Sequence, residues 1–434
     1  MPLELSTSET GFETSFQGLL GQKRENAVDV NDTVFAILAD VRARGDEAVL
    51  ELTSRFDRFD LSSETMAFSA AEIDAAIAEA DVADVTALEE AAGRIEDYHR
   101  RQVPNESRHV DDAGVETGYR WTAVQSVGLY VPGGKAAYPS SVLMNAIPAR
   151  AAGVERVVMV VPTPDGVVHP LVLAAARISG ITEIYRIGGA QAVAALAYGT
   201  PTIAAVDKIV GPGNAYVAAA KRQVFGTVGI DMIAGPSEIL VVADADNNPD
   251  WIAADLLSQA EHDEDAQAIL ITDNADFADA VAHAVDRTLA TLDRQAIATA
   301  SWRDFGAIIV VDNLDQAAAL VDRVAPEHLE LAVADPDALA GKITNAGAIF
   351  LGRHTPEAIG DYVAGPSHVL PTSRSARFSS GLSVLDFMKR TSLIRCDAQS
   401  VNRIGAAAVQ LANAEGFGAH ALSVALRLDQ KRNA

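Results

Sequence analysis

Short apolar runs rich in Val and Ile alternate with alanine-rich helical stretches from Val124 onwards, and this alternation constrains the fold more than any other feature of the chain. Strands that are continuously apolar, each followed by a helical crossover, are typical of a parallel sheet covered on both faces. The expected strands form two series, 127–131, 156–161, 183–187, 208–210 and 230–232, and then 239–242, 268–271, 307–311, 329–333 and 348–351. We therefore predict an α/β protein with two Rossmann-like, doubly wound parallel sheets.

Helical patterns also lie on either side of the two series. After a polar N-terminal arm, apolar residues recur at helical spacing over 30–59, with an interruption at Gly45, and over 70–101. Two further helices are expected over 397–414 and 419–428. Because two helices cannot close a core of their own, we expect them to dock onto another subunit.

The charge balance excludes some classes of partner. The 434 residues include 59 Asp and Glu against 34 Lys and Arg, which gives a formal charge of −25. A nucleic-acid backbone or an anionic membrane surface would be repelled, so both are disfavoured. Surplus carboxylates and scarce lysines also suggest adaptation to high salt. Folding and activity that did not depend on salt concentration would contradict that hypothesis.

Cysteine usage narrows the kinds of metal site. Cys396 is the single cysteine, which excludes a disulfide within the chain and every zinc motif built on paired cysteines. A metal would have to be bound by His together with carboxylate or amide oxygen. The first 22 residues lack the basic and apolar segments of a secretory signal, and no apolar run approaches the ~20 residues of a membrane span. A cytoplasmic protein is therefore expected.

Three glycine-containing junctions follow strands of the first series. They are YVPGGK at 130–135, IGGAQ at 187–191 and VGPGN at 210–214. Each places small residues and backbone N–H groups at the carboxyl end of a parallel strand, where doubly wound sheets bind ligands. Neither a GxGxxG fingerprint nor a complete Walker loop is present. Ordinary turns and a nucleotide-sized crevice both remain open as interpretations.

Two pairs of residues could carry chemistry. A helix that begins at Asn248 and Pro249 would place Gln259 and His262 on one face near its end, where they could share a metal ion. Two solvated helix residues are the simpler interpretation, because Gln is an uncommon zinc ligand.

The second pair is Glu327 and His328, which lie side by side where a helix gives way to a strand and offer two groups for proton transfer. On local evidence alone, an ordinary helix-start or turn sequence is the preferred interpretation of this pair. Asp361, His368 and His420 lie further along the chain, and spacing alone assigns them no role.

Several long motifs follow one another along nearly the whole chain. They are RARGDEA at 42–48, GLYVPGGK at 128–135, YPSSVLM at 138–144, IGGAQA at 187–192, GPGN at 211–214, GPSE at 235–238, QAEH at 259–262, APEHL at 325–329 and AEGFGAH at 414–420. In this order they resemble the motifs of the histidinol dehydrogenase family, although the N-terminal arm matches weakly. The resemblance implies an NAD-dependent, zinc-requiring alcohol and aldehyde dehydrogenase. Such an enzyme oxidises L-histidinol by four electrons, through L-histidinal, to L-histidine in the last step of histidine biosynthesis, and reduces two NAD molecules.

The resemblance also implies roles for individual residues. One zinc ion per subunit would be bound by Gln259, His262, Asp361 and His420, and the imidazole and amino nitrogens of the substrate would complete its coordination. His328 would accept protons during both hydride transfers, and Glu327 would activate the water that hydrates the aldehyde. The substrate would contact Ser237, Gln259, His262, His328, Asp361, Glu415 and His420, and NAD would contact Tyr130, Gln191 and Asn214.

The family's architecture implies four parts and a shared site. They are an N-terminal arm (1–23), a discontinuous Rossmann-like domain (24–122 and 237–382), an inserted Rossmann-like domain (123–236) and a helical C-terminal arm for dimerisation (383–434). In a homodimer, Glu415 and His420 would reach the partner's active site. A zinc hydrolase with Glu327 as its base, and a metal- or nucleotide-binding module without activity, are the rival interpretations.

Overall fold

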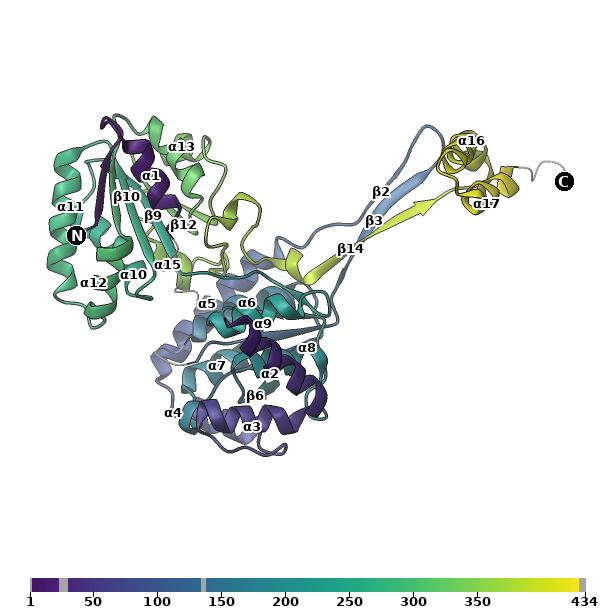
Figure 1. Ribbon diagram of the computed structural model, residues 1–434, viewed down its shortest axis with the longest axis horizontal. Helices are drawn as coiled ribbons and strands as arrows, with labels where there is room; N and C mark the ends of the chain where they lie inside the picture. Colours follow the sequence, from purple (N-terminus) through teal and green to yellow (C-terminus); the bar gives the residue numbers. More distant parts are fainter. Residues whose placement is uncertain (1, 23–29, 134–137, 429–434) are drawn as a thin grey trace.

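The computed structural model describes residues 2–22, 30–133 and 138–428. Within these residues, the larger sheet is parallel and has six strands (Figure 1). In spatial order they are β1 (Leu3–Ser6), β11 (Ala307–Val310), β10 (Gln267–Thr272), β9 (Glu238–Ala243), β12 (His328–Ala332) and β13 (Ala348–Leu351). The helices associated with it are α1 (Phe12–Leu20), α10 (Pro249–Ala260), α11 (Ala275–Leu289), α12 (Gln295–Phe305), α13 (Asp315–Val324), α14 (Pro336–Ala340) and α15 (Glu357–Tyr362).

Side chains of β9 alternate between two hydrophobic cores, one on each face of this sheet. Ile239 and Val241 pack toward α10, α11 and α12, whereas Leu240 and Val242 pack toward α1, α13 and α14. A strand buried on both faces needs apolar residues at successive positions, which is the pattern that predicted it. The doubly wound arrangement is confirmed for this sheet.

The second parallel sheet has five strands and lies below the first in Figure 1. In spatial order they are β6 (Glu183–Tyr185), β5 (Arg156–Val160), β4 (Ser126–Tyr130), β7 (Lys208–Val210) and β8 (Gly229–Ile230). Its own crossovers are α6 (Pro139–Ala151), α7 (Pro170–Ile178), α8 (Gly189–Tyr198) and α9 (Ala215–Val224), with a 3₁₀ turn at Pro164–Gly166. The strands of both predicted series are therefore confirmed, with differences of a few residues at their ends.

The helices between residues 31 and 100 pack on the five-stranded sheet. They are α2 (Asn31–Arg44), α3 (Asp46–Asp57), α4 (Ala70–Glu79) and α5 (Val82–Arg100). Val34 and Val41 of α2 are fully buried in one core with α8 and α9, and Ile95 of α5 is fully buried in the other core with α6 and α7. The expectation that 24–122 share a domain with 237–382 is therefore wrong for these helices. An amphipathic pattern specifies an apolar face but not the surface that covers it.

The first residues of the chain do not form an arm. Strand β1 pairs in parallel with β11 at the edge of the six-stranded sheet, and α1 buries Phe16 and Leu19 in its core. The prediction of an N-terminal arm over 1–23 is therefore wrong. Nothing in the sequence indicated the strand, because Leu5 is the single buried residue of β1 and four residues with one buried position show no alternation. In the chain, the five-stranded sheet and helices α2 to α5 are thus inserted between β1 and β9.

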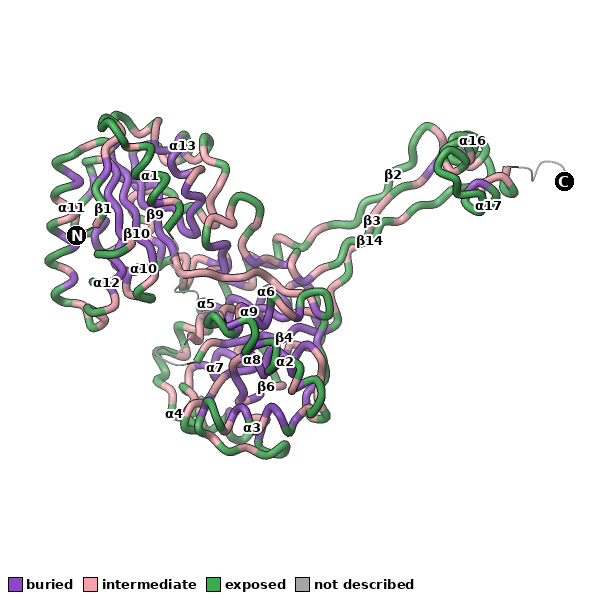
Figure 2. The backbone as a smooth tube through the Cα atoms, viewed as in Figure 1, coloured by how far each residue is buried: buried purple, intermediate pink, exposed green. Residues whose placement is uncertain are grey.

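An arm does project from the molecule, but it is not purely helical (Figure 1). An antiparallel ribbon of β2 (Ser107–Val110), β3 (Glu116–Ala123) and β14 (Met388–Arg395) carries α16 (Ala398–Ala414) and α17 (Gly418–Leu428) at its far end. Figure 2 shows that most of the arm is exposed. The arm expected over 383–434 therefore also includes 107–123, whereas the 3₁₀ turn Val384–Phe387 buries Phe387 in the core of the five-stranded unit.

Two short features complete the description. A 3₁₀ turn, Ser375–Arg377, lies between the six-stranded sheet and the arm. Within the described ranges, no helix is both long and apolar enough to cross a bilayer.

A buried ion pair supports the loop that follows β7. The Nζ of Lys221 lies 2.5 Å from Oδ1 of Asp231 and donates a hydrogen bond to the carbonyl oxygen of Gly211, and Oδ2 of Asp231 accepts from the Gly211 N–H. The Lys221 and Asp231 side chains are 3% and 1% exposed. A side chain at Gly211, whose φ is +108°, would overlap the Tyr130 carbonyl oxygen.

We expect Lys221→Met to lower the free energy of unfolding by about 3–5 kcal/mol, because it leaves a buried carboxylate unpaired. Urea denaturation of the full chain measures the change. Lys342→Met is the matched control, since Lys342 pairs with Asp315 at the surface, where such a pair contributes about 0–1 kcal/mol. Equal losses in the two variants would contradict this account.

Candidate active site

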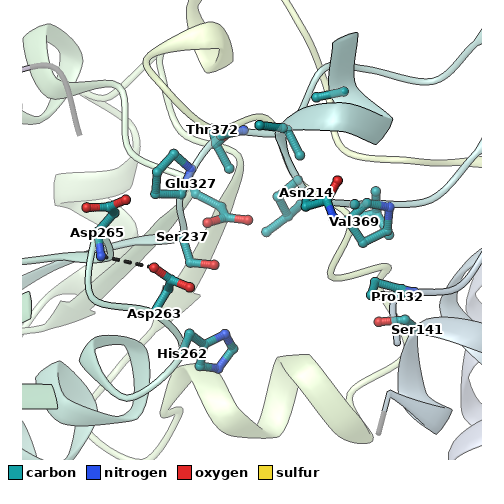
Figure 3. A pocket seen from close by; sticks show the side chains of 18 of the residues that line it. Pro132, Ser141, Asn214, Ser237, His262, Asp263, Asp265, Glu327, Val369 and Thr372 are labelled. Atoms are coloured by element: carbon teal, nitrogen blue, oxygen red, sulfur yellow. Dashed lines mark hydrogen bonds between the residues drawn. The ribbon is translucent and has the colours of Figure 1, made fainter. Parts of the chain in front are cut away.

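A cavity of about 940 Å³ lies between the two sheets. Its walls come from the carboxyl ends of β4 and β7 and from the amino ends of β9 and β12. Figure 3 shows Ser237, His262 and Glu327 on one side of this cavity and Pro132, Ser141 and Asn214 on the other. Of the residues singled out from the sequence, the cavity is lined by Asn214, Ser237, Gln259, His262, Glu327, His328, Asp361 and His368.

Helix α10 places Gln259 in its last turn as the sequence predicts, whereas His262 lies just beyond the helix, which ends at Ala260. Asn248 caps the helix by accepting the Asp250 N–H at 2.9 Å, and Pro249 occupies its first turn. Gln259 is fully buried, and neither atom of its amide has a hydrogen-bond partner within the described part of the chain. The His262 N–H donates to the Gln259 carbonyl oxygen at 3.1 Å. Both residues thus lie at a helix C-terminus, whose partial negative charge favours a cation.

His262 is accessible from the cavity, and desolvation by the surrounding protein lowers its pKa below the ordinary value. A lowered pKa keeps the imidazole neutral at working pH. A neutral imidazole is the form that binds metal ions.

Glu327 and His328 lie at the start of β12, next to the start of β9. The Glu327 carboxylate accepts the Glu238 N–H at 2.9 Å. The Nδ1 of His328 lies 2.9 Å from the Glu238 carbonyl oxygen, which can only accept, so Nδ1 carries the proton. The other ring nitrogen, Nε2, is therefore the one that can take up a proton, and it has no hydrogen-bond partner in the described ranges.

Carboxylates surround the His328 ring. Its Nε2 lies 3.5 Å from Oδ1 of Asp361 and 3.8 Å from Oε1 of Glu357, and Nδ1 lies 3.6 Å from Oε2 of Glu327. Although burial alone would favour the neutral ring, these charges outweigh it and raise the pKa of His328 to about 10. The ring is thus poised to hold a proton.

Asp361 lies on α15 and faces three imidazoles. Burial disfavours its charge, but contact with His328 and the nearby His368 and His262 rings lower its pKa to about 2. His368 reaches the Asp361 carbonyl oxygen through Nδ1 at 3.0 Å and the Ser141 hydroxyl through Nε2 at 3.2 Å. His368 therefore connects α15, which belongs to the six-stranded sheet, to α6, which belongs to the five-stranded sheet.

Glu357 is a site residue that the sequence did not single out. It is 2% exposed, its Oε2 accepts the Ser258 hydroxyl at 2.8 Å, and burial raises its pKa to about 7. His328, Glu357 and Asp361 offer ligand atoms that all lie within 4.8 Å of one another. An acidic residue that follows Pro356 at the start of a helix looks like an ordinary helix-terminal charge, so nothing in the sequence distinguished it.

The three residues expected to contact NAD are placed differently from one another. Asn214 lines the cavity and caps α9 by accepting the Tyr216 and Val217 N–H groups. Tyr130 and Gln191 are buried beside it without lining the cavity, and the Tyr130 hydroxyl accepts the Gly189 N–H at 3.0 Å. Gly134 and Lys135 of the first glycine junction lie outside the described residues.

Two expected site residues are not brought to the cavity by their own chain. Glu415 follows α16 and His420 lies on α17, at the far end of the arm, and both are exposed (Figure 1). His420 contacts the ring of Phe417, with the ring centroids 5.3 Å apart. Within one chain, the four expected zinc ligands are therefore reduced to three.

The chain is similar over almost its full length to proteins from bacteria that are named histidinol dehydrogenase. It is 67% identical over 431 residues to a protein of Rhodospirillum rubrum named histidinol dehydrogenase, and 65% identical over 430 residues to one of Ruegeria pomeroyi with the same name. In both cases 99% of each chain is covered. These relatives come from organisms that are not halophiles, so the comparisons do not support the adaptation to high salt suggested by the charge.

A solved structure extends the similarity to the fold. The crystal structure of histidinol dehydrogenase from Elizabethkingia anophelis matches with a TM-score of 0.95 at 35% identity, covering 100% of this chain and 99% of that one. The model of the histidinol dehydrogenase family matches residues 20–428. The expectation based on the motifs is thus confirmed, and the chain belongs to the histidinol dehydrogenase family.

Proposed function

We propose that this chain uses zinc and NAD to oxidise L-histidinol by four electrons, through L-histidinal, to L-histidine. The observation that carries the proposal is one cavity that joins the Glu327–His328 pair to Gln259, His262 and Asp361. Family membership supports the overall activity. The cofactors and the individual roles rest on the chemistry of these side chains.

The residues present fit a zinc ion. Gln259 is fully buried with both amide atoms unpartnered in the described structure, an arrangement that costs free energy unless a ligand satisfies the group. His262 and Asp361 add an imidazole and an ionised carboxylate, which complete a nitrogen and oxygen donor set that suits zinc. Zinc, when bound, would supply a Lewis-acidic attachment point that fixes the orientation of the substrate's nitrogen atoms.

His328 serves as the general base in this proposal. The hydroxyl proton of the alcohol passes to Nε2 as the hydride leaves its carbon for NAD, which leaves the aldehyde. A cation at Asp361 would offset one of the charges that raise the pKa of His328, so the ring would then release its proton more easily. The same nitrogen accepts the proton of the hydrated aldehyde during the second hydride transfer.

Glu327 activates water between the two oxidations. Its carboxylate takes a proton from water as the oxygen adds to the aldehyde carbon, and the proton that His328 took from the alcohol passes to the former carbonyl oxygen, so the product is the neutral hydrate. Because Glu327 lines the same cavity as His328, both groups can act at one carbon without release of the aldehyde. Ser237 lies on the same wall, where it would contact the substrate.

NAD would lie on the side of the cavity formed by the five-stranded sheet. Asn214 lines this side, and Tyr130 at the end of β4 and Gln191 in the first turn of α8 are buried near it. Placing the cofactor there puts it opposite Glu327 and His328, with the substrate between them.

The arm would complete the site of a second copy of this chain. Exposed apolar residues on its two helices and in the turn between them include Leu411, Phe417, Leu422 and Leu426, which need a covering surface. A partner's His420 would supply the missing zinc ligand, and its Glu415 would contact the substrate. We therefore propose a homodimer with shared active sites.

The test is the appearance of NADH when histidinol and NAD are added to zinc-loaded protein. We expect NADH to accumulate only when histidinol, NAD and the protein are all present. A zinc hydrolase or a binding module without activity would produce no NADH. Absence of NADH from folded protein of verified zinc content would therefore refute the proposal.

Removing the metal is expected to abolish histidinol oxidation and to leave NAD binding intact, because the three expected ligands lie on the substrate side of the cavity. Turnover and NAD affinity are measured before and after treatment with a chelator, and again after zinc is restored. Undiminished turnover by protein shown to be metal-free by elemental analysis would contradict the zinc assignment.

A further inference from the structure

We propose that Glu238 is a positioning residue that holds Glu327 and His328 in their working geometry. The inference rests on the proposed function, in which those two residues move protons. Glu238 ends the GPSE motif, where the family resemblance implied a role for Ser237 alone. It is 3% exposed and forms the first residue of β9.

Reciprocal hydrogen bonds join Glu238 to Glu327. The Glu238 N–H donates to Oε2 of Glu327 at 2.9 Å, and the Glu327 N–H donates to Oε2 of Glu238 at 3.3 Å. The two residues begin or precede neighbouring parallel strands, since His328 of β12 is paired with Ile239 of β9. Each carboxylate thus accepts a backbone N–H of the opposite residue, which fixes both the start of β12 and the Glu327 side chain.

The backbone of Glu238 also holds the His328 ring. Its carbonyl oxygen lies 2.9 Å from Nδ1 and selects the tautomer in which Nε2 is the basic nitrogen. A small shift of β9 at this residue would therefore tilt the ring relative to Asp361 and the cavity. Fixing a reacting group to well under an ångström is worth large factors in rate.

A third segment is anchored by the same carboxylate. The Ser373 N–H donates to Oε1 of Glu238 at 2.9 Å, and the preceding residue, Thr372, lines the cavity. Ser373 and Arg374 both have left-handed backbone conformations, with φ of 53° and 63°, so this turn needs stabilising contacts. Glu238 thus connects β9, β12 and the 372–374 turn around one cavity.

Glutamine cannot reproduce these contacts. Both carboxylate oxygens accept a backbone N–H, whereas an amide has one oxygen and one NH₂ group. In Glu238→Gln, the NH₂ group would face either the Glu327 or the Ser373 N–H and lose that hydrogen bond. The substitution keeps the side chain's size, so the site should loosen while the fold is retained.

The experiment combines steady-state kinetics with amide hydrogen exchange on zinc-loaded protein. For Glu238→Gln we expect kcat with histidinol and with histidinal to fall by about 10- to 100-fold. The KM for histidinol, the zinc content and NAD binding should remain close to those of the wild type. Exchange of the Glu327 and Ser373 amides should become faster, because one or both lose their acceptor.

Asp46→Asn is the matched control. Asp46 is also buried, its two oxygens accept the hydroxyl and the N–H of Thr202, and neither residue lines the cavity. The control should lower stability without changing kcat. If Glu238→Gln does not fold, Glu238→Asp replaces it, since the shorter carboxylate cannot reach both N–H groups.

Four outcomes would overturn the inference. They are an unchanged kcat, a change confined to KM or zinc content, unchanged exchange at both amides, and loss of the fold in both Glu238 variants. Inactive wild-type protein would instead refute the proposed function, and the exchange measurement would still decide whether Glu238 holds these two segments.

Discussion

Replacing His328 with asparagine is expected to slow both hydride transfers by roughly 10²–10⁴-fold, the usual contribution of a general base. The variant keeps a polar side chain but has no nitrogen that can take up a proton in place of Nε2. Rates are measured separately with histidinol and with histidinal as the starting substrate. His283→Asn, which changes an exposed histidine on α11, is the control and should leave both rates unchanged.

Glu327→Gln should separate the two oxidations. An amide cannot accept a proton from water, so hydration of the aldehyde should slow while oxidation of the alcohol continues. Histidinal would then accumulate or be released. An unimpaired conversion of the aldehyde to the acid in this variant would contradict the roles assigned to the pair.

Mixing two inactive variants is expected to restore activity if the active sites are shared. His420→Asn removes a zinc ligand that acts in the partner, and His328→Asn removes the base of its own site. In a hybrid dimer, one site then has both defects and the other has neither. With equal exchange of subunits, half of the dimers are hybrids with one intact site of two, so about a quarter of wild-type activity should return.

The control for this experiment is a mixture of His328→Asn with Glu327→Gln. Both defects lie on the cavity side of the chain, so every site in a hybrid carries one of them and no intact site forms. No recovery in the first mixture, after subunit exchange has been verified, would contradict the sharing of sites. Recovery in both mixtures would contradict the placement of His420 in the partner.

The sequence predicted the sheets well because strands buried on both faces have an unambiguous apolar pattern. The strand 208–210 is found as β7 with the same limits, and the N-cap at Asn248 correctly placed Gln259 and His262 near the end of α10. These features depend on a few neighbouring residues. Local patterns are therefore sufficient to specify them.

Other features depend on contacts that no local pattern records. The apolar face of α2 was evident, but the sheet that it covers was not, since several surfaces can accept such a face. Glu238 and Glu357 become part of the site only because β9, β12 and α15 meet at one end of a sheet. The ribbon of the arm pairs β3 with β14, which are separated by more than half of the chain.

The position of the site also differs from the simplest rule for this fold class. Ligands of doubly wound sheets usually bind at the carboxyl ends of the strands. The five-stranded sheet follows this rule with Asn214 after β7, whereas the six-stranded sheet contributes Ser237, Glu327 and His328 from the amino ends of β9 and β12. The carboxyl edge of one sheet thus faces the amino edge of the other across the cavity. In this arrangement the proposed cofactor and the proton-transfer residues can approach a substrate from opposite sides.

The four-electron oxidation is tested most directly by the number of NADH molecules formed per molecule of histidinol when histidinol is limiting and NAD is in excess. We expect two NADH and one histidine for each histidinol consumed, because both proposed oxidations occur at one carbon in one cavity. A yield of one NADH, with histidinal as the end product, would contradict the four-electron oxidation. A yield of zero would contradict the dehydrogenase activity itself.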